Sequence, residues 1–298
     1  MNATSPKRIL VTGGTGFIGR NLVELLGSRH HVVAPPRREL DLNDDASVAA
    51  FFRNHSFDAV IHSATTPAHR NAKPSDDVAF RNLRMFFHLM REEGHWGRML
   101  VLGSGAEYDA RHYAPKMDED RFGLHVPADP SGFSKYVVSR FAESHPRVTV
   151  LRLFGVFGKY EDWEIRFISN AIAKALFDRP ITLRKNRRFD YLWIEDLAPV
   201  LEHFLAHEPV RRAYNVTPDE PIALLDAAKL VREVTGKSVE IRVAEEGMGD
   251  EYSGSNARLR AEIPALSFTP PRAAIEKLAA WYSANRERIR PDALEVDK

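Results

Sequence analysis

Short runs of hydrophobic residues alternate with segments of helical spacing through the first half of the chain. Five runs have the length and aliphatic content of buried strands: 8–12, 31–34, 58–64, 98–103 and 148–153. Four segments between them are predicted as helices: 17–26, 43–54, 75–93 and 131–143. Strands that alternate with helices predict an α/β fold, in which helices cover both faces of a parallel sheet.

The alternation changes after about residue 155. The pattern predicts helices at 162–178, 196–206, 222–235 and 272–285, strands at "ITL", "YLWI", 213–216 and 239–243, and a glycine-rich loop at 247–254. Residues 213–216 can return to the first sheet. The sequence therefore predicts two units. Residues 1–155 with about 190–215 form a first domain, and 156–189 with 216–298 form a smaller C-terminal α/β lobe.

The loop after the first predicted strand carries the most specific motif. In "LVTGGTGFIGRNL", Gly13, Gly16 and Gly19 follow a strand and open a helix. The first glycine suits a tight turn, the second lets the backbone approach a pyrophosphate, and the third permits close packing of helix on strand. The helix N-terminus offers free N–H groups to phosphates. This context favours a dinucleotide site over a glycine turn without a ligand.

The segment after the second strand, "PPRRELDLND", indicates which dinucleotide is bound. NAD sites usually have an acidic residue here for the ribose 2′-hydroxyl, whereas an arginine suits the 2′-phosphate of NADP. Arg37 and Arg38 occupy this place. NADP(H) is therefore favoured over NAD, and the alternative is a solvated surface pair of arginines.

The composition excludes several classes of function. The chain has 298 residues, 44% of them hydrophobic and 28% charged, and a net charge of +1, which gives no reason to expect nucleic acid or an acidic membrane as partner. No stretch approaches the ~20 apolar residues that span a bilayer. The absence of cysteine excludes disulfides and thiolate metal sites and fits the cytoplasm. The histidines show no metal-binding spacing, so no metal is expected.

These motifs, together with "DAVIHSAT", a serine after the fourth strand and the segment around Lys135, resemble the extended short-chain dehydrogenase/reductases, from residue 8 to about 282. The stretch 37–64 is similar to GDP-fucose synthase. Within that group the chain looks most like the GDP-6-deoxy-4-keto-heptose reductases of bacterial capsule clusters. The resemblance implies a Rossmann-type doubly wound parallel sheet that binds NADP(H), with a substrate-binding C-terminal lobe.

The resemblance also implies roles for particular residues. Ser104 matches the catalytic serine, and Lys135 matches the lysine that binds the nicotinamide ribose and acidifies the catalytic tyrosine. The cofactor would be bound by Gly13, Thr15, Gly16, Phe17, Ile18, Gly19, Arg37, Asp41, Leu42, Ser63, Ala64, Thr65, Asn82 and Lys135.

The chain departs from the family at the catalytic tyrosine, four residues before the lysine, where it has Ser131. Tyrosine protonates the oxygen that becomes negative on hydride transfer, and a positioned acid is worth about 10²–10⁴ in rate. Tyr136 is adjacent to Lys135 but points about 100° away from it on a helix. Tyr108 is the better candidate for a displaced acid, and Ser131, Ser104 or a bound water are the others.

Two further departures exclude related chemistries. Dehydratases of this family have an acidic residue after the catalytic serine, but this chain has Gly105 and Ala106 there, and Glu107 comes one step too late. The GDP-fucose synthases epimerise with a cysteine and a histidine. Ala106 replaces that cysteine, and Arg166 lies near the histidine position. Simple ketoreduction therefore remains.

A nucleotide-sugar substrate needs its diphosphate neutralised, and arginine matches phosphate oxygens in a bidentate manner. Arg187 and Arg188 in "LRKNRRFDY" are the first candidates for this contact, although a solvated basic turn is the alternative. Arg258 is a weaker candidate. With Ser104 and Arg166, these residues form the expected substrate site.

The expected activity is NADP(H)-dependent reduction of the C4 keto group of a GDP-linked 6-deoxy sugar, and the resemblance points to the heptose intermediate of capsule or surface polysaccharide synthesis. One alternative is a nucleotide-sugar 4-epimerase. Another is a catalytically inactive NADP-binding or regulatory protein, because the tyrosine is missing. By analogy with the family, a cytoplasmic homodimer is expected.

Overall fold

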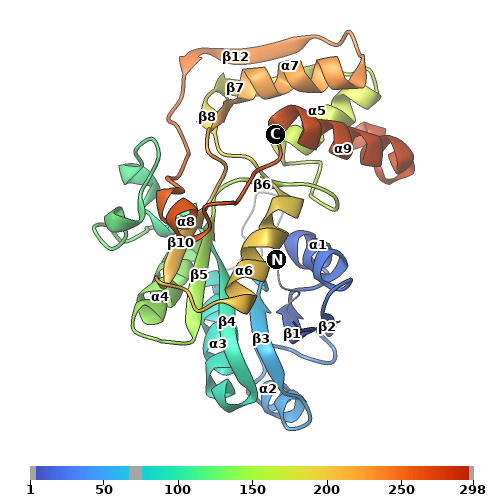
Figure 1. Ribbon diagram of the computed structural model, residues 1–298. Helices are drawn as coiled ribbons and strands as arrows, with labels where there is room; N and C mark the ends of the chain where they lie inside the picture. The colour runs from blue at the N-terminus through green and yellow to red at the C-terminus, as the bar shows by residue number, and fades with distance from the viewer. Residues whose placement is uncertain (1–4, 67–75, 295–298) are drawn as a thin grey trace.

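A parallel sheet of six strands forms the centre of the computed structural model, which describes residues 5–66 and 76–294 (Figure 1). The strand order is β10-β5-β4-β3-β1-β2, so the α/β prediction is confirmed. Residues 213–216 do return to this sheet, as its edge strand beside β5. The bounds are β1 (Arg8–Thr12), β2 (His31–Val33), β3 (Phe57–His62), β4 (Trp96–Ser104), β5 (Val148–Leu153) and β10 (Ala213–Val216).

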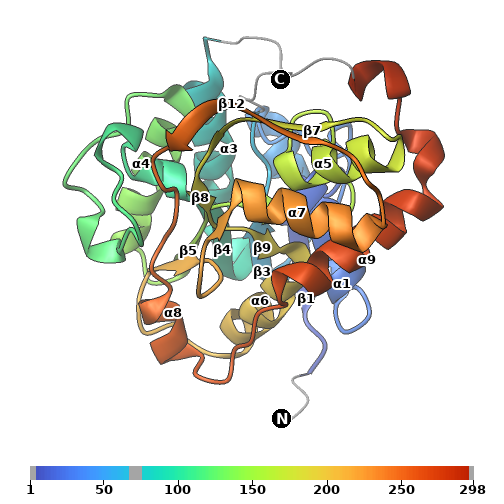
Figure 2. The same ribbon diagram turned by 90° about the horizontal axis from the view of Figure 1, so that it is seen from above.

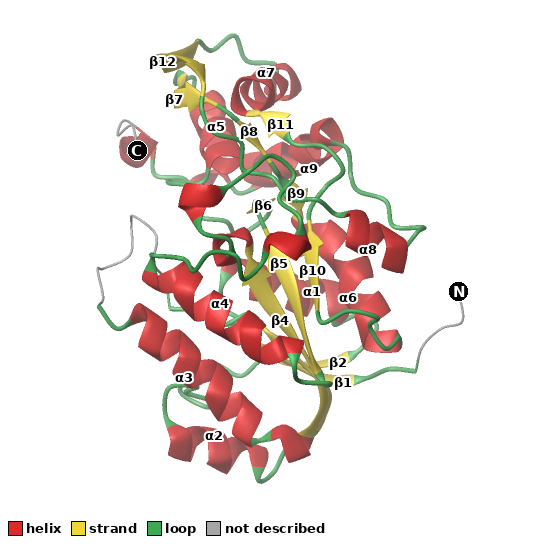
Figure 3. Ribbon diagram, turned by 90° about the vertical axis from the view of Figure 1, so that its left-hand side faces the viewer, coloured by secondary structure: helices red, strands yellow, loops and turns green. Residues whose placement is uncertain are grey.

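Helices cover both faces of this sheet (Figure 3). On one face lie α2 (Asp45–Phe52), α3 (Val78–Arg91) and α4 (Pro130–Glu143), and on the other lie α1 (Phe17–Leu26) and α6 (Leu197–Ala206). The burial of both faces explains the continuous apolar run in strand β1. Ile9 and Val11 belong to the core of one face, whereas Leu10 belongs to the core of the other. Because both faces are buried, each successive side chain must be hydrophobic.

The second lobe, which we define as α5, β7, α7, β12 and α9, lies over one end of the sheet (Figures 1 and 2). Strand β12 pairs with β7 in parallel, and α5, α7 and α9 pack together beside this pair. Its elements are α5 (Phe167–Leu176), β7 (Ile181–Asn186), α7 (Leu224–Thr235), β12 (Ile241–Met248) and α9 (Pro271–Ala284). Shorter elements connect the two parts: β6 (Val156–Phe157), β8 (Arg188–Phe189), β9 (Leu192–Trp193), β11 (Ile222–Ala223) and α8 (Ala257–Glu262).

The two largest boundary differences in this half lie at the start of α5 and at the end of β12. The helix predicted from residue 162 begins only at Phe167, because Asp162 forms a turn in which its side chain accepts the Glu164 N–H. The strand predicted at 239–243 extends to Met248, with a register shift after Glu245 and a positive φ of 80° at Gly247. The first residues of the predicted glycine-rich loop are therefore part of a bulged strand.

A buried ion pair joins β5 to the turn that follows β4. The Nε of Arg152 lies 2.6 Å from Oε2 of Glu107, and the two side chains are 1% and 0% exposed. The Glu107 carboxylate also accepts hydrogen bonds from the Ser104 N–H, at 2.9 Å, and from the Ser139 hydroxyl on α4. Buried charges need such additional hydrogen bonds, because mutual attraction alone rarely offsets the cost of removing both ions from water.

Replacing Glu107 by glutamine should destabilise the protein, because it leaves the Arg152 charge buried without its counter-ion. We expect the free energy of unfolding to fall by about 3–5 kcal/mol, measured by urea denaturation. The double variant Glu107→Leu with Arg152→Met removes both charges and should recover part of this loss, because the Ser104 N–H and the Ser139 hydroxyl still lose their acceptor. A single variant within about 1 kcal/mol of the unmodified protein would contradict the assignment.

Candidate functional site

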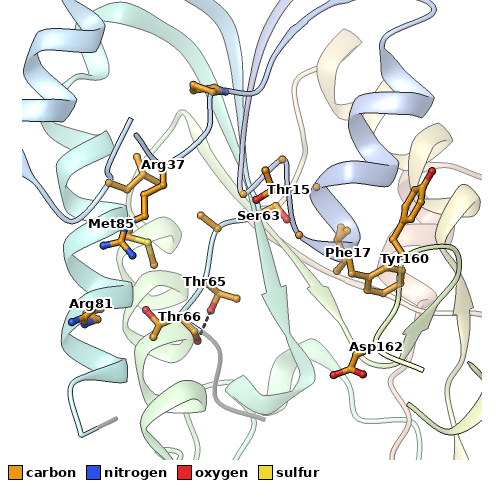
Figure 4. A pocket seen from close by; sticks show the side chains of 18 of the residues that line it. Thr15, Phe17, Arg37, Ser63, Thr65, Thr66, Arg81, Met85, Tyr160 and Asp162 are labelled. Atoms are coloured by element: carbon orange, nitrogen blue, oxygen red, sulfur yellow. Dashed lines mark hydrogen bonds between the residues drawn. The ribbon is translucent and has the colours of Figure 1, made fainter. Parts of the chain in front are cut away.

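A cleft of about 690 Å³ opens at the carboxyl ends of β1 and β3 (Figure 4). Strand β2 lies on one side of β1 and strand β3 on the other, so the strand order reverses at β1. Open α/β sheets bind ligands at such a switch point. The cleft is lined by residues 13–19, Arg37, Asp41, Leu42, Ser63, Ala64, Thr65, Thr66, Arg81, Met85 and the segment 160–166 in part. All the cofactor residues expected from the sequence line it except Asn82 and Lys135.

The glycine loop forms the floor of the cleft. Gly13 has a φ of 70°, and a Cβ there would lie 2.9 Å from the backbone of Ala64. A Cβ at Gly19 would lie 2.2 Å from the carbonyl oxygen of Gly13, so the helix can approach the strand only without a side chain. Gly16 caps α1 and offers no side-chain acceptor to the first-turn N–H groups. This cradle fits the pyrophosphate of a dinucleotide.

Two arginines line one side of the cleft, beside Met85 (Figure 4). Arg37 donates from Nε to the Asp41 carboxylate at 3.0 Å, and 71% of its side chain is exposed. Arg81 lies on α3 and pairs with Asp77. Arg38, in contrast, is 83% exposed and lies near Glu39, outside the lining. Arg81 was missed from the sequence, because no motif marks it and only the fold of α3 brings it to this wall.

Polar groups at the end of β3 fix the floor of the cleft toward α4. The Thr12 hydroxyl accepts the N–H groups of Ser63 and Ala64, at 3.1 and 3.2 Å. Asn82 accepts the Thr66 N–H at 2.7 Å and donates to the Ser134 hydroxyl at 3.2 Å. Asn82 is 8% exposed. It therefore positions this loop against α4, from beneath the lining of the cleft.

The opposite wall comes from the segment before α5. Phe17 faces Tyr160 and Asp162 there, as Figure 4 shows, and Arg166 also lines the cleft. Arg166 was expected in the substrate site, and the structure places it at the dinucleotide cleft. Glu161 lies in the same wall, is 6% exposed and accepts a hydrogen bond of 2.5 Å from Ser169. Burial raises the pKa of Glu161 to about 8.

Ser104 ends β4 and caps the short 3₁₀ turn Gly105–Glu107. Its hydroxyl accepts the Ala106 N–H at 3.1 Å, while Glu107 reaches back to the Ser104 N–H. This reciprocal capping box holds the serine at the carboxyl end of the sheet. In this turn, the Glu107 carboxylate points into the core toward Arg152. It is therefore not placed as the acidic residue of a dehydratase site.

Lys135 lies in the second turn of α4 and reaches β4 near the carboxyl end of that strand. Its ammonium donates to the Leu102 carbonyl at 2.9 Å, in a small cavity also lined by His62, Asn82 and Ser134. Burial lowers the pKa of Lys135. The lysine and the serine are therefore brought to the same edge of the sheet from elements far apart in the sequence, as the resemblance implies.

The two hydroxyl residues expected as replacement acids lie in different surroundings. Tyr108 is 4% exposed, and its hydroxyl donates to the Asn215 side chain at 2.8 Å. Burial raises the pKa of Tyr108 well above its ordinary value. Ser131 is in the first turn of α4, where its carbonyl accepts the Ser134 hydroxyl at 2.8 Å. The Tyr108 hydroxyl is thus held inside the fold, facing β10.

The expected phosphate-binding arginines are not equivalent. Arg188 donates to the Pro221 carbonyl at 3.1 Å and lies 3.4 Å from Glu251. Arg258 pairs with Asp120 at 2.8 Å and with Glu119 at 3.9 Å. Arg187 packs over the Phe189 ring, and its buried Nε has no hydrogen-bond partner among the described residues. Of the three, Arg187 is therefore the one whose guanidinium is least engaged by protein groups.

Within residues 5–66 and 76–294, no group of three or more acidic or histidine side chains is placed to hold a metal ion. Over the same ranges, none of the helices combines the length and the apolar character required to cross a membrane.

Residues 9–217 match the model of the NAD dependent epimerase/dehydratase family. Two curated relatives are similar over different lengths. The GDP-L-fucose synthase of Azorhizobium caulinodans is 33% identical, but over 25% of this chain and 24% of its own length. The dTDP-4-dehydro-6-deoxy-D-allose reductase of a Streptomyces species is 24% identical over 94% of this chain and 97% of its own.

Among solved structures, the GDP-mannoheptose C4 reductase of Campylobacter jejuni, determined with NADP bound, resembles the whole fold. It superposes with a TM-score of 0.80 at 17% identity, over 95% of this chain and 99% of its own. At this identity the likeness concerns the fold.

The pKa of Glu161 predicts a pH dependence of stability. Between its unfolded value of 4.5 and about 8, the folded protein retains a proton that the unfolded chain has lost. The stability contribution of this group should therefore be complete below pH 4.5 and should be lost as the pH rises from there to about 8. Glu161→Gln stays neutral, so urea midpoints measured between pH 5 and 8 should decline less than in the unmodified protein. The exposed control Glu246→Gln should keep the original slope. Equal slopes in Glu161→Gln and the unmodified protein would disprove the assignment.

Proposed function

The chain belongs to the NAD dependent epimerase/dehydratase family, and from this premise we propose that it is an NADP(H)-dependent reductase. Its substrate is a nucleotide-linked 4-keto-6-deoxy sugar, GDP-6-deoxy-4-keto-heptose in the most specific form of the proposal. The observation that carries it is the glycine cradle with Arg37 and Arg81 at one side, and Ser104 and Lys135 at the same edge of the sheet.

Each part of the site has a role in this proposal. The N–H groups that open α1 bind the pyrophosphate, and Arg37 and Arg81 neutralise the 2′-phosphate. When bound, the reduced nicotinamide supplies a hydride to the sugar C4. The Ser104 hydroxyl holds the O4 that becomes negative, and the Lys135 ammonium stabilises the nicotinamide ribose from beneath.

Two of the relatives' names support reduction at C4. One is named a C4 reductase of a GDP-mannoheptose and another a reductase of a dTDP-linked 4-dehydro-6-deoxy sugar. The GDP-linked relatives support guanine as the base. We assign the diphosphate contact to Arg187, since Arg188 and Arg258 are engaged by acidic residues. This reaction would belong to capsule polysaccharide synthesis.

The proposal also assigns roles to the two domains and an oligomeric state to the protein. We infer that residues 1–155 with about 190–215 bind the dinucleotide, to whose cleft the segment 160–166 adds a wall, and that the rest of 156–189 with 216–298 binds the sugar nucleotide. A cytoplasmic homodimer without nucleic-acid or membrane partners is proposed. Phe80 and Phe87 on α3 and Phe133 on α4 are 61%, 37% and 40% exposed, which supports a dimer contact through these helices.

The decisive experiment is NADPH oxidation, followed by absorbance, with GDP-6-deoxy-4-keto-heptose as substrate and a GDP-hexose lacking the keto group as control. We expect oxidation only with the keto sugar. A protein that binds NADPH but never oxidises it would be a dinucleotide-binding protein instead. One that retains oxidised cofactor and interconverts C4 epimers without net absorbance change would be an epimerase.

Arg37→Ala tests the choice of NADP over NAD. Loss of a charge-assisted contact to the 2′-phosphate costs about 1.5–3 kcal/mol, which weakens NADPH binding about 10- to 150-fold while NADH binding stays the same. Fluorescence titration of both dinucleotides measures this. Arg38→Ala is the matched control and should leave both affinities unchanged. Equal weakening of NADPH and NADH by Arg37→Ala would contradict a 2′-phosphate contact.

A further inference from the structure

A tyrosine far along the chain reaches Ser104. After β12, the chain descends from the second lobe to α8 beside β10 (Figure 1). On this segment, the hydroxyl of Tyr252 lies against Gly105, where a Cβ would come within 2.5 Å of it, and it interacts with the neighbouring Ser104 and Tyr113 side chains. Tyr252 therefore presents a phenol at the serine that the proposed function assigns to the sugar O4. Tyr252 comes 117 residues after Lys135 in the sequence. No sequence motif therefore predicts that it lies beside Ser104.

The Tyr252 ring is held firmly in this place. The backbone N–H of Tyr252 donates to the Arg188 carbonyl, and the backbone carbonyl of Tyr252 accepts the Asp190 N–H, both at 3.0 Å. The ring packs against Phe154 and Phe189, with centroids 5.1 and 4.9 Å away. Backbone and ring contacts from several elements thus preorganise the hydroxyl, as a catalytic group requires.

The Tyr252 hydroxyl leaves no room for a side chain on the residue after Ser104, which is Gly105. A Cβ at Gly105 would lie 2.5 Å from the Tyr252 hydroxyl oxygen and 2.7 Å from the Phe154 ring. Any side chain at position 105 would displace the tyrosine. The acidic residue that a dehydratase has at position 105 would need the space that the Tyr252 hydroxyl occupies. The absence of that acidic residue and the presence of Tyr252 are therefore linked.

We propose that Tyr252 is the catalytic acid of this enzyme, in place of the tyrosine that Ser131 replaces. The inference rests on the proposed reductase function. As the C4 carbon accepts a hydride from the reduced nicotinamide, the O4 accepts the proton of the Tyr252 hydroxyl. The C=O group becomes CH–OH, and the resulting phenolate regains its proton from solvent. Ser104 donates a second hydrogen bond to the O4.

The surroundings of Tyr252 keep it protonated before the reaction. Burial raises the pKa of Tyr252 to about 12, opposed by hydrogen bonds with Tyr113 and Ser104. The negative charges of Asp190 and Glu107 act in the same direction as burial. At neutral pH Tyr252 is therefore a neutral phenol and still carries the proton that it would donate.

Tyr252→Phe tests the acid, because it keeps the packed ring and removes only the hydroxyl. NADPH oxidation with the 4-keto sugar should fall about 10²- to 10⁴-fold, while NADPH affinity, measured by fluorescence, stays within twofold. The matched control is Tyr136→Phe, which lies next to Lys135 and packs on Phe122. Its rate should equal that of the unmodified protein.

The outcomes separate the two proposals. An active unmodified enzyme with Tyr252→Phe within threefold of its rate overturns the acid and leaves the reductase intact. An unmodified protein that does not oxidise NADPH overturns the reductase, and the acid falls with it.

A crystal structure of the unmodified protein with NADP⁺ and the GDP-linked alcohol product gives a test independent of turnover and of the variant's folding. We expect the O4 within ~2.6–3.2 Å of the Tyr252 hydroxyl. An O4 that lies beyond this hydrogen-bonding reach overturns the assignment.

Discussion

The buried ion pair between Arg152 and Glu107 is the constraint on which the catalytic end of this protein depends. It joins β5 to the turn after β4, and through the Ser139 hydroxyl it also holds α4, the helix of Lys135. Two charges can be buried only when their remaining hydrogen-bonding groups are largely satisfied, which leaves the geometry little freedom. The carboxylate that balances Arg152 also caps the Ser104 N–H, so the position of the serine is set by the electrostatics of the core.

The cofactor end of the site is built on a different principle. Its floor is a local motif, in which three glycines and the start of one helix form an anion cradle. Its walls come from elsewhere: Arg81 from α3 and the segment of Tyr160 and Asp162 from the approach to α5. The cradle provides general affinity for a dinucleotide, whereas the walls contribute the charges that distinguish one dinucleotide from another.

On the proposed function, Tyr252 would let the fold keep its chemistry although Ser131 replaces the family's catalytic tyrosine. A proton donor must be a suitable group near the right atom, and the reaction does not depend on which part of the chain supplies it. Here the segment after β12 supplies a phenol, and Gly105 leaves the room for it. On the proposed function, the second lobe therefore contributes to the chemistry as well as to substrate binding.

The sequence by itself determined the α/β fold, the strands of the central sheet and the cofactor cradle, because these depend on local patterns. Continuous apolar runs mark doubly buried strands, and the glycines act within a few residues of one another. The family resemblance also singled out Ser104 and Lys135 for catalytic roles, which stay predictions, and the structure brings both to β4. The sequence misplaced the start of α5, since the Asp162 turn is stabilised by a side-chain hydrogen bond that periodicity does not detect. Only the tertiary structure decided that Tyr108 faces the core, that Arg81 joins Arg37, and that Tyr252 meets Ser104. Such contacts join residues far apart in the chain, and no local pattern encodes which side chains the packing of helices and sheet will bring together.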